Sequence, residues 1–138
     1  MNSQLLKISL LLTRFFCVWM MGLWAWDRIV DPSHASGIAS RYYSVGGLDV
    51  AAAPHVLIGI VLLVLYLLAL IGFKKKFTYL FLFLVHALGT LFVLKLSLPF
   101  FEGFRLTWMT SWPALMAMWV LWVLRDEDTL LSLQGKWG

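Results

Sequence analysis

An uninterrupted apolar run at residues 56–73 constrains this chain more than any other feature. Fourteen of its 18 residues are Leu, Ile, Phe or Val, and none is charged. At roughly 0.3–0.6 kcal/mol for each such residue, a helix built from this run favours membrane insertion by roughly 4–8 kcal/mol. A helix of this length also matches the hydrocarbon core of a bilayer. The run therefore predicts a membrane-spanning α-helix.

The rest of the chain has the same character. Of its 138 residues, 62% are hydrophobic and 13% are charged, against roughly 25% charged in soluble proteins. Three further apolar runs lie at residues 5–26, 77–94 and 106–124. We therefore predict one all-α domain over residues 1–138, an integral membrane four-helix bundle in contact with the lipid bilayer. The net charge of +4 does not indicate nucleic-acid binding, because the basic residues mostly flank apolar runs.

The segments between these runs predict the connections. Asp31-Pro32 reads as an N-cap followed by proline at the first helical position, and predicts a short interfacial helix at residues 32–44 between the first and second spans. Three lysines at 74–76 leave room only for a tight turn, so the second and third spans should form an antiparallel hairpin. Residues 27–55 and 95–105 form two outer loops, and residues 125–138 form a short solvated tail.

The distribution of basic residues predicts the orientation. Seven Lys or Arg residues fall on one side of the predicted spans, and four fall on the other. The richer side carries the chain ends and the three lysines, and basic residues favour the cytoplasmic side. We expect a multi-pass protein of the cell membrane, the inner membrane of a bacterium, with both termini in the cytoplasm.

Arg14 is the least expected residue of the first run. Eight Leu, Ile, Phe or Val residues at 8–26 favour insertion by about 2–5 kcal/mol, and a central arginine cancels about 2.5–3.5 kcal/mol of this. Arg14 therefore either extends to the interface or has a partner within the bundle. At 3.6 residues per turn it shares one face, which should pack inward, with Cys17, Val18, Met21, Ala25 and Arg28.

An intramembrane polar site is one interpretation of this face. His86 and Thr90 lie one turn apart in the third run, and His86 falls at a depth similar to that of Cys17. Arg14, Cys17, His86 and Thr90 would then hold a quinone head group or relay a proton. The alternative is structural: Arg14 reaches the interface, and His86 bonds a backbone carbonyl or a tyrosine of a neighbouring helix. Because Cys17 is the single cysteine, an intrachain disulfide and a C-x-x-C site are excluded.

Charged residues beside the outer loops form a second candidate site. Asp27, Arg28 and Asp31 are close in sequence, and Arg41, Glu102 and Arg105 lie in or beside the two loops. This group is either a docking patch or an ion-paired helix end. A haem held by His34, His55 and His86 is disfavoured, because the depths of His55 and His86 differ by roughly 10 Å or more. We predict no catalytic residue and no metal site.

The opening third of the chain resembles the DoxX-like superfamily, which includes MauE-like membrane proteins. The resemblance is carried by Arg14, Gly22, the stretch Ala25-Trp26-Asp27-Arg28, Asp31-Pro32, Ile38 and Tyr42-Tyr43. Ala25 replaces the glycine of that pattern, and Arg28 replaces its lysine. The resemblance implies a four-helix membrane bundle that serves a larger partner, and it carries over no catalytic residue.

Three functions follow from these observations. The first is a small accessory subunit that binds and stabilises a larger membrane protein of a redox or respiratory assembly. The second is a quinone-handling subunit of a membrane oxidoreductase, with Arg14 and His86 lining its pocket. The third is a small transporter that acts as a homo-oligomer. This function is weakened because the sequence lacks the inverted repeats common in transporters.

Overall fold

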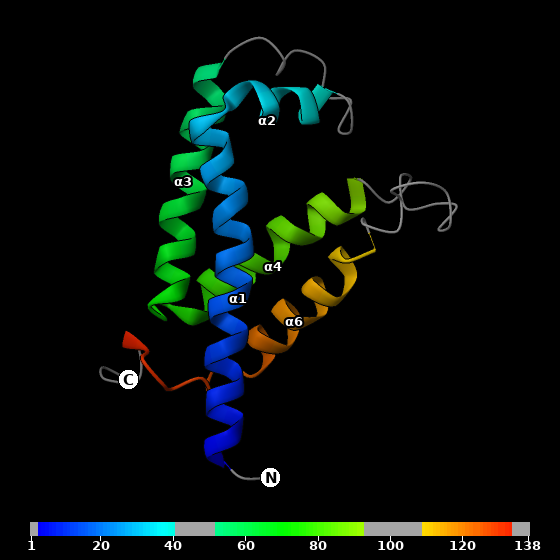
Figure 1. The fold of residues 1–138 in the computed structure, drawn as a ribbon. Helices are drawn as coiled ribbons and strands as arrows, with labels where there is room; N and C mark the ends of the chain where they lie inside the picture. Colours follow the sequence, from blue (N-terminus) through cyan, green and yellow to red (C-terminus); the bar gives the residue numbers. More distant parts are fainter. Residues whose placement is uncertain (1–2, 41–51, 93–108, 134–138) are drawn as a thin grey trace.

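The described part of the chain is entirely helical (Figure 1). The computed structural model describes residues 3–40, 52–92 and 109–133. Its helices are α1 (Ser3–Val30), α2 (Pro32–Ile38), α3 (Ala52–Leu70), α4 (Lys75–Phe92) and α6 (Ser111–Val123). Helices α1 and α4 are long and apolar enough to cross a membrane, and α3 and α6 contribute shorter apolar segments. The predicted all-α class is confirmed, and insertion of four spans stays a prediction.

Helix α1 lies at the centre of the molecule. Helix α3 runs along its side, while α4 and α6 form a second pair that is inclined to both (Figure 1). The tight turn predicted between the second and third spans is present at residues 71–74. Helix α4 nevertheless leans away from α3 and packs mainly on α6. The two helices of the predicted hairpin thus belong to different pairs.

The contact between α1 and α3 depends on small residues. A Cβ atom added at Gly59 of α3 would lie 2.8 Å from the backbone oxygen of Ala25 and 2.8 Å from Cγ1 of Ile29. Ala25 itself is only 1% exposed. The two backbones therefore approach each other more closely than any larger residue at position 59 would permit.

The inward face predicted for α1 is largely confirmed. The buried residues of α1 are Leu10, Arg14, Cys17, Val18, Met21 and Ala25. Large apolar side chains occupy the opposite side and are exposed, among them Phe16, Trp19, Leu23 and Trp26. The other helices complete the core with Tyr66, Ala69, Tyr79, Leu82, Met118 and Leu121.

A glycine ends α3 and sets the direction of the following turn. Gly72 has a φ of 67°, a left-handed conformation that favours glycine. Its N–H donates to the Ala69 oxygen (3.0 Å), and the Phe73 N–H donates to the Leu68 oxygen (2.9 Å), which is the Schellman pattern. The Ile71 oxygen accepts from the N–H of Leu133 (2.9 Å). The chain after α6 therefore packs against this turn.

Candidate functional site

Arg14 is enclosed by the chain that follows α6. Its side chain is 1% exposed. Nη1 donates to Oδ2 of Asp128 (3.1 Å) and to the hydroxyl of Tyr79 (3.3 Å). Nη2 donates to the backbone oxygens of Leu130 (2.7 Å) and Leu131 (3.2 Å). Arg14 is thus paired within the bundle, the second of the two arrangements expected from its sequence.

Asp128 is the centre of this buried cluster. It is 0% exposed, and its Oδ2 also accepts the hydroxyl of Tyr79 (2.6 Å). Its backbone oxygen accepts from Nζ of Lys75 (2.9 Å). We call Arg14, Lys75, Tyr79 and Asp128 the tail clamp. The expectation of a solvated tail is wrong for Asp128 and Ser132, which are buried because the tail supplies the counter-charge to Arg14.

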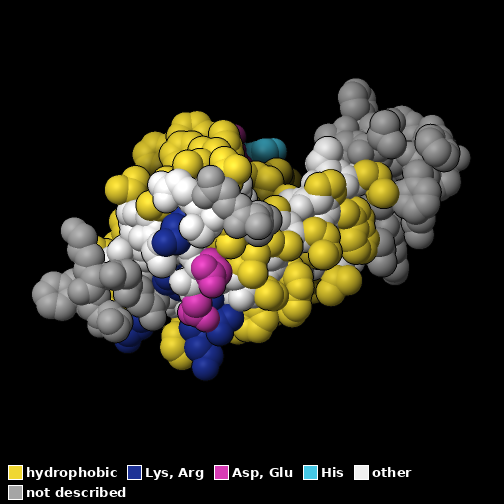
Figure 2. Space-filling model, turned by 90° about the horizontal axis from the view of Figure 1, so that it is seen from below, with side chains coloured by type: hydrophobic (Ala, Val, Ile, Leu, Met, Phe, Trp, Pro, Cys, Tyr) yellow, Lys and Arg dark blue, Asp and Glu magenta, His cyan; other side chains and the backbone are white. Residues whose placement is uncertain are grey.

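The charges around the tail clamp gather at one end of the molecule. Viewed from that end, basic and acidic side chains lie together beside a wide hydrophobic surface (Figure 2). Lys74 and Lys76 are exposed there, whereas Lys75 is buried. The three lysines therefore differ in role, because the middle one bonds the tail.

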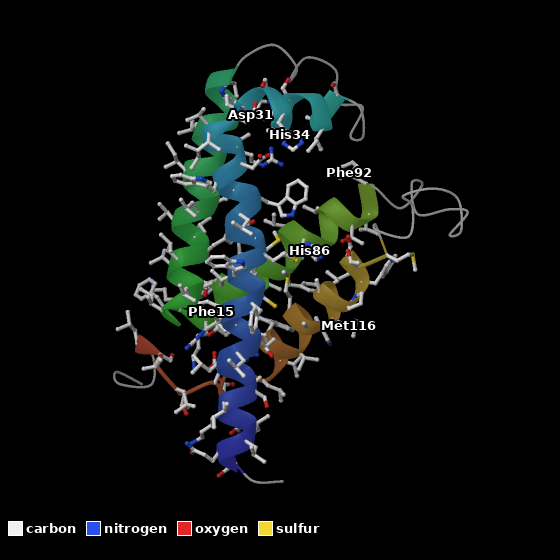
Figure 3. All side chains as sticks on the ribbon, viewed as in Figure 1. Phe15, Asp31, His34, His86, Phe92 and Met116 are labelled. Carbon is white, nitrogen blue, oxygen red and sulfur yellow. The ribbon has the colours of Figure 1, made fainter. Side chains whose placement is uncertain are left out.

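His86 and Thr90 occupy a different part of the bundle. Nε2 of His86 lies 3.0 Å from the backbone oxygen of Ser111, and the Thr90 hydroxyl donates to the His86 oxygen (2.9 Å). A carbonyl oxygen only accepts, so Nε2 carries the proton, and Nδ1 is an acceptor when the ring is neutral. His86 lies on α4 below the level of His34 and Asp31 (Figure 3). Its bond to a backbone carbonyl is the structural role considered for it.

A cavity of about 160 Å³ lies beside His86. Helices α1, α2, α3 and α4 and the first residue of α6 contribute to its walls. Apolar side chains make up most of the lining, and polar groups enter from several helices. The lining residues are Met21, Trp24, Ala25, Asp27, Arg28, Ala35, Ile38, Leu62, Tyr66, Val85, His86, Gly89, Thr90 and Ser111.

The four residues of the predicted intramembrane site fall in two places. His86 and Thr90 line the cavity, whereas Arg14 belongs to the tail clamp and Cys17 to the apolar core. The shared face of α1 was predicted correctly. Arg14 is bonded by Tyr79 of α4 and by the chain after α6, and not by His86.

The residues of the predicted outer charged patch also have separate roles. Asp27 accepts from Nδ1 of His34 (2.8 Å), and Arg28 lines the cavity. Asp31 caps α2 through a bond from the His34 N–H (3.0 Å), as its sequence predicts. The Ser33 hydroxyl and this N–H stabilise the carboxylate and lower the pKa of Asp31. Arg41, Glu102 and Arg105 lie outside the described residues, as do residues 41–44 of the predicted interfacial helix.

The histidines do not converge. His34 pairs with Asp27, His86 bonds Ser111, and His55 is buried in the first turns of α3. Among residues 3–40, 52–92 and 109–133, no group of three His, Cys, Asp or Glu side chains is placed to hold a metal ion.

Sequence reasoning missed Asp128, Tyr79 and Lys75 as partners of the first helix. Two signals point toward them in retrospect. An arginine in an apolar helix needs a counter-charge, and three acidic residues lie at 126–128, near the start of the tail. The separation of 114 positions between Arg14 and Asp128 gives no local pattern that identifies the pair.

Comparison with known proteins supplies no family for this chain. No family model matches it, and no curated protein or solved structure matches it either.

Proposed function

We propose that this chain is a small membrane accessory subunit that binds and stabilises a larger membrane protein. An aromatic ridge on α1 carries the proposal. It consists of Phe15, Phe16 and Trp19, with ring centroids 5.4 Å apart for Phe15 and Phe16 and 6.1 Å apart for Phe15 and Trp19. All three side chains are exposed, by 44%, 62% and 59%.

The depth of the ridge argues for a protein partner. At 1.5 Å per residue, Trp19 lies roughly 24 Å from the start of α1 and roughly 17 Å from its end. Tryptophan in membrane proteins concentrates at the two interfaces, and Trp19 lies between them in a spanning α1. A cluster of contacting aromatic rings at mid-depth suits packing against a further helix. The proposed occupant is a hydrophobic transmembrane helix of a redox or respiratory assembly, consistent with the DoxX-like resemblance.

The proposed orientation follows from the charges. The N-terminal half of α1, the turn at 71–74 and the chain after α6 lie toward the same end (Figure 1). Basic residues are concentrated in these segments, so we place this end in the cytoplasm of a bacterial cell.

Native mass spectrometry of protein extracted gently from its own membrane tests the proposal. We expect a larger protein bound in fixed ratio, and loss of that complex in the double variant Phe16→Leu/Trp19→Leu, which keeps α1 apolar. Trp26→Leu is the matched control, because Trp26 is 54% exposed on the same helix near its end. A lone monomer, a homo-oligomer or equal loss with the control variant would contradict the proposal, and a homo-oligomer would favour the small transporter.

A quinone-handling subunit is the second candidate. The presence of His86 and Thr90 on one cavity favours it. Its pocket would use Arg28 in place of Arg14, because Arg14 is committed to the tail clamp.

A further inference from the structure

The cavity beside His86 has the size of a small-molecule site. Its volume is about 160 Å³, close to the roughly 150 Å³ of an engineered protein cavity that binds benzene. Apolar side chains of three helices provide its walls, including Met21 of α1, Leu62 of α3 and Val85 of α4. Trp24 adds an aromatic surface. The space therefore accommodates one six-membered ring.

Tyr66 gives this cavity a hydrogen-bond donor. The residue is 2% exposed and lines the cavity. Its hydroxyl forms no hydrogen bond to any residue in the described part of the chain. The hydroxyl oxygen is not fully enclosed by protein atoms, so it is accessible from the cavity. The equivalent buried phenol of α4, Tyr79, bonds both Arg14 and Asp128, whereas the hydroxyl of Tyr66 is a donor that a molecule bound in the cavity can engage.

Arg28 gives the same cavity a positive charge. Within residues 3–40, 52–92 and 109–133, its guanidinium makes no ion pair or hydrogen bond. Asp27 is the neighbouring carboxylate on the cavity wall, and it is bonded to His34. A guanidinium offers five N–H donors and binds carboxylates with two parallel hydrogen bonds. The polar part of the cavity therefore suits an anionic oxygen group.

We propose that this cavity binds a small carboxylate that carries one apolar ring. The ring lies among Trp24, Leu62 and Val85, and the carboxylate accepts hydrogen bonds from Arg28 and Tyr66. The site is independent of the aromatic ridge of α1, so it does not rest on the accessory-subunit function. It differs from the quinone pocket of the second candidate, because it requires a negative charge on the ligand.

Isothermal titration calorimetry of the purified full-length protein with benzoate tests this site. We expect one benzoate per chain, with an affinity reduced about 10-fold to 100-fold in Arg28→Gln, since hydrogen bonds to charged groups are worth this factor. Tyr66→Phe removes only the hydroxyl and should also weaken binding. Lys76→Gln is the matched control, because it removes one exposed positive charge outside the cavity, and its affinity should be unchanged.

Two comparison ligands and a folding measurement make the result decisive. Benzyl alcohol has the same ring without the charge and should bind more weakly than benzoate by a factor similar to that of Arg28→Gln. Unfolding temperatures equal to that of the unchanged protein would show that the variants fold. Absence of benzoate binding, or equal binding by Arg28→Gln, would overturn the proposal. Tight binding of neutral duroquinone that is insensitive to Arg28→Gln would overturn it as well, and would assign the cavity to the second candidate.

Discussion

Two regions of this bundle use similar residues in opposite ways. Each has an arginine from α1 and a tyrosine from a neighbouring helix: Arg14 with Tyr79 in the tail clamp, and Arg28 with Tyr66 at the cavity. Arg14 and Tyr79 both bond the carboxylate of Asp128. Arg28 and Tyr66 face a cavity, and no carboxylate of the described chain engages them.

The role of a buried polar group here depends on its hydrogen-bond partners and not on its residue type alone. In the tail clamp, the charge of Arg14 is neutralised by the chain itself, and the cluster holds α1, α4 and the tail together. At the cavity, no carboxylate within residues 3–40, 52–92 and 109–133 bonds the corresponding pair. The carboxylate of Asp128 thus has the role in the tail clamp that we propose for a ligand in the cavity.

Removal of Asp128 should have the largest effect on stability. Asp128→Ala leaves Arg14 buried without its counter-charge, and loss of one partner of a buried pair costs about 3–5 kcal/mol. Denaturant unfolding in detergent measures the change. Asp126→Ala is the control, because Asp126 is 85% exposed and lies 3.8 Å from Arg125, and its change should stay within about 0.5 kcal/mol.

A double variant separates charge from packing in the tail clamp. Arg14→Met/Asp128→Leu replaces the pair with apolar side chains, and such replacements are often neutral or stabilising. It should recover most of the stability lost in Asp128→Ala. An Asp128→Ala protein as stable as the unchanged protein would refute the structural role of the tail clamp.

Enlargement of Gly59 should have an intermediate effect near the cavity. Gly59→Val forces a side chain against the Ala25 oxygen and Ile29, and overpacking of this kind costs about 1–3 kcal/mol. The free energy of unfolding is the measurement. Gly22→Ala is the control, because its added Cβ would meet no neighbouring helix within 4 Å, and alanine favours a helix by about 1 kcal/mol over glycine. Equal destabilisation by both variants would contradict the close contact of α1 and α3.

The Asp31 cap should produce the smallest effect, confined to low pH. The pKa of Asp31 is lowered from its usual 3.8 by the Ser33 hydroxyl and the His34 N–H. A lowered folded-state pKa means that the cap contributes fully above pH 3.8 and is lost as the pH falls through the lower value. The ¹⁵N–¹H shift of His34 should titrate with a midpoint below 3.8. The Asp31→Asn protein should lack this transition, and a midpoint at or above 3.8 would contradict the cap.

Helix positions and the inward face of α1 were predictable because they depend on local periodicity. The runs at 5–26 and 77–94 correspond to α1 and α4, and Asp31-Pro32 begins α2 as predicted. Arg14 and Ala25 lie on the predicted inward face of α1 because helical spacing alone puts them there. The end of α3 at Leu70, before the end of the apolar run, follows from the turn that Gly72 makes.

Residue types and their spacing were enough to predict an all-helical, strongly apolar chain with an arginine in need of a counter-charge. The packing of the helices was needed to show that Asp128 supplies this charge and that His86 lines a separate cavity with Arg28 and Tyr66. The physical reason is that helical periodicity is read within a few turns of the chain, whereas ion pairs and cavities depend on how helices cross. Here the crossing is set by the short turn at Gly72 and by the close contact at Gly59.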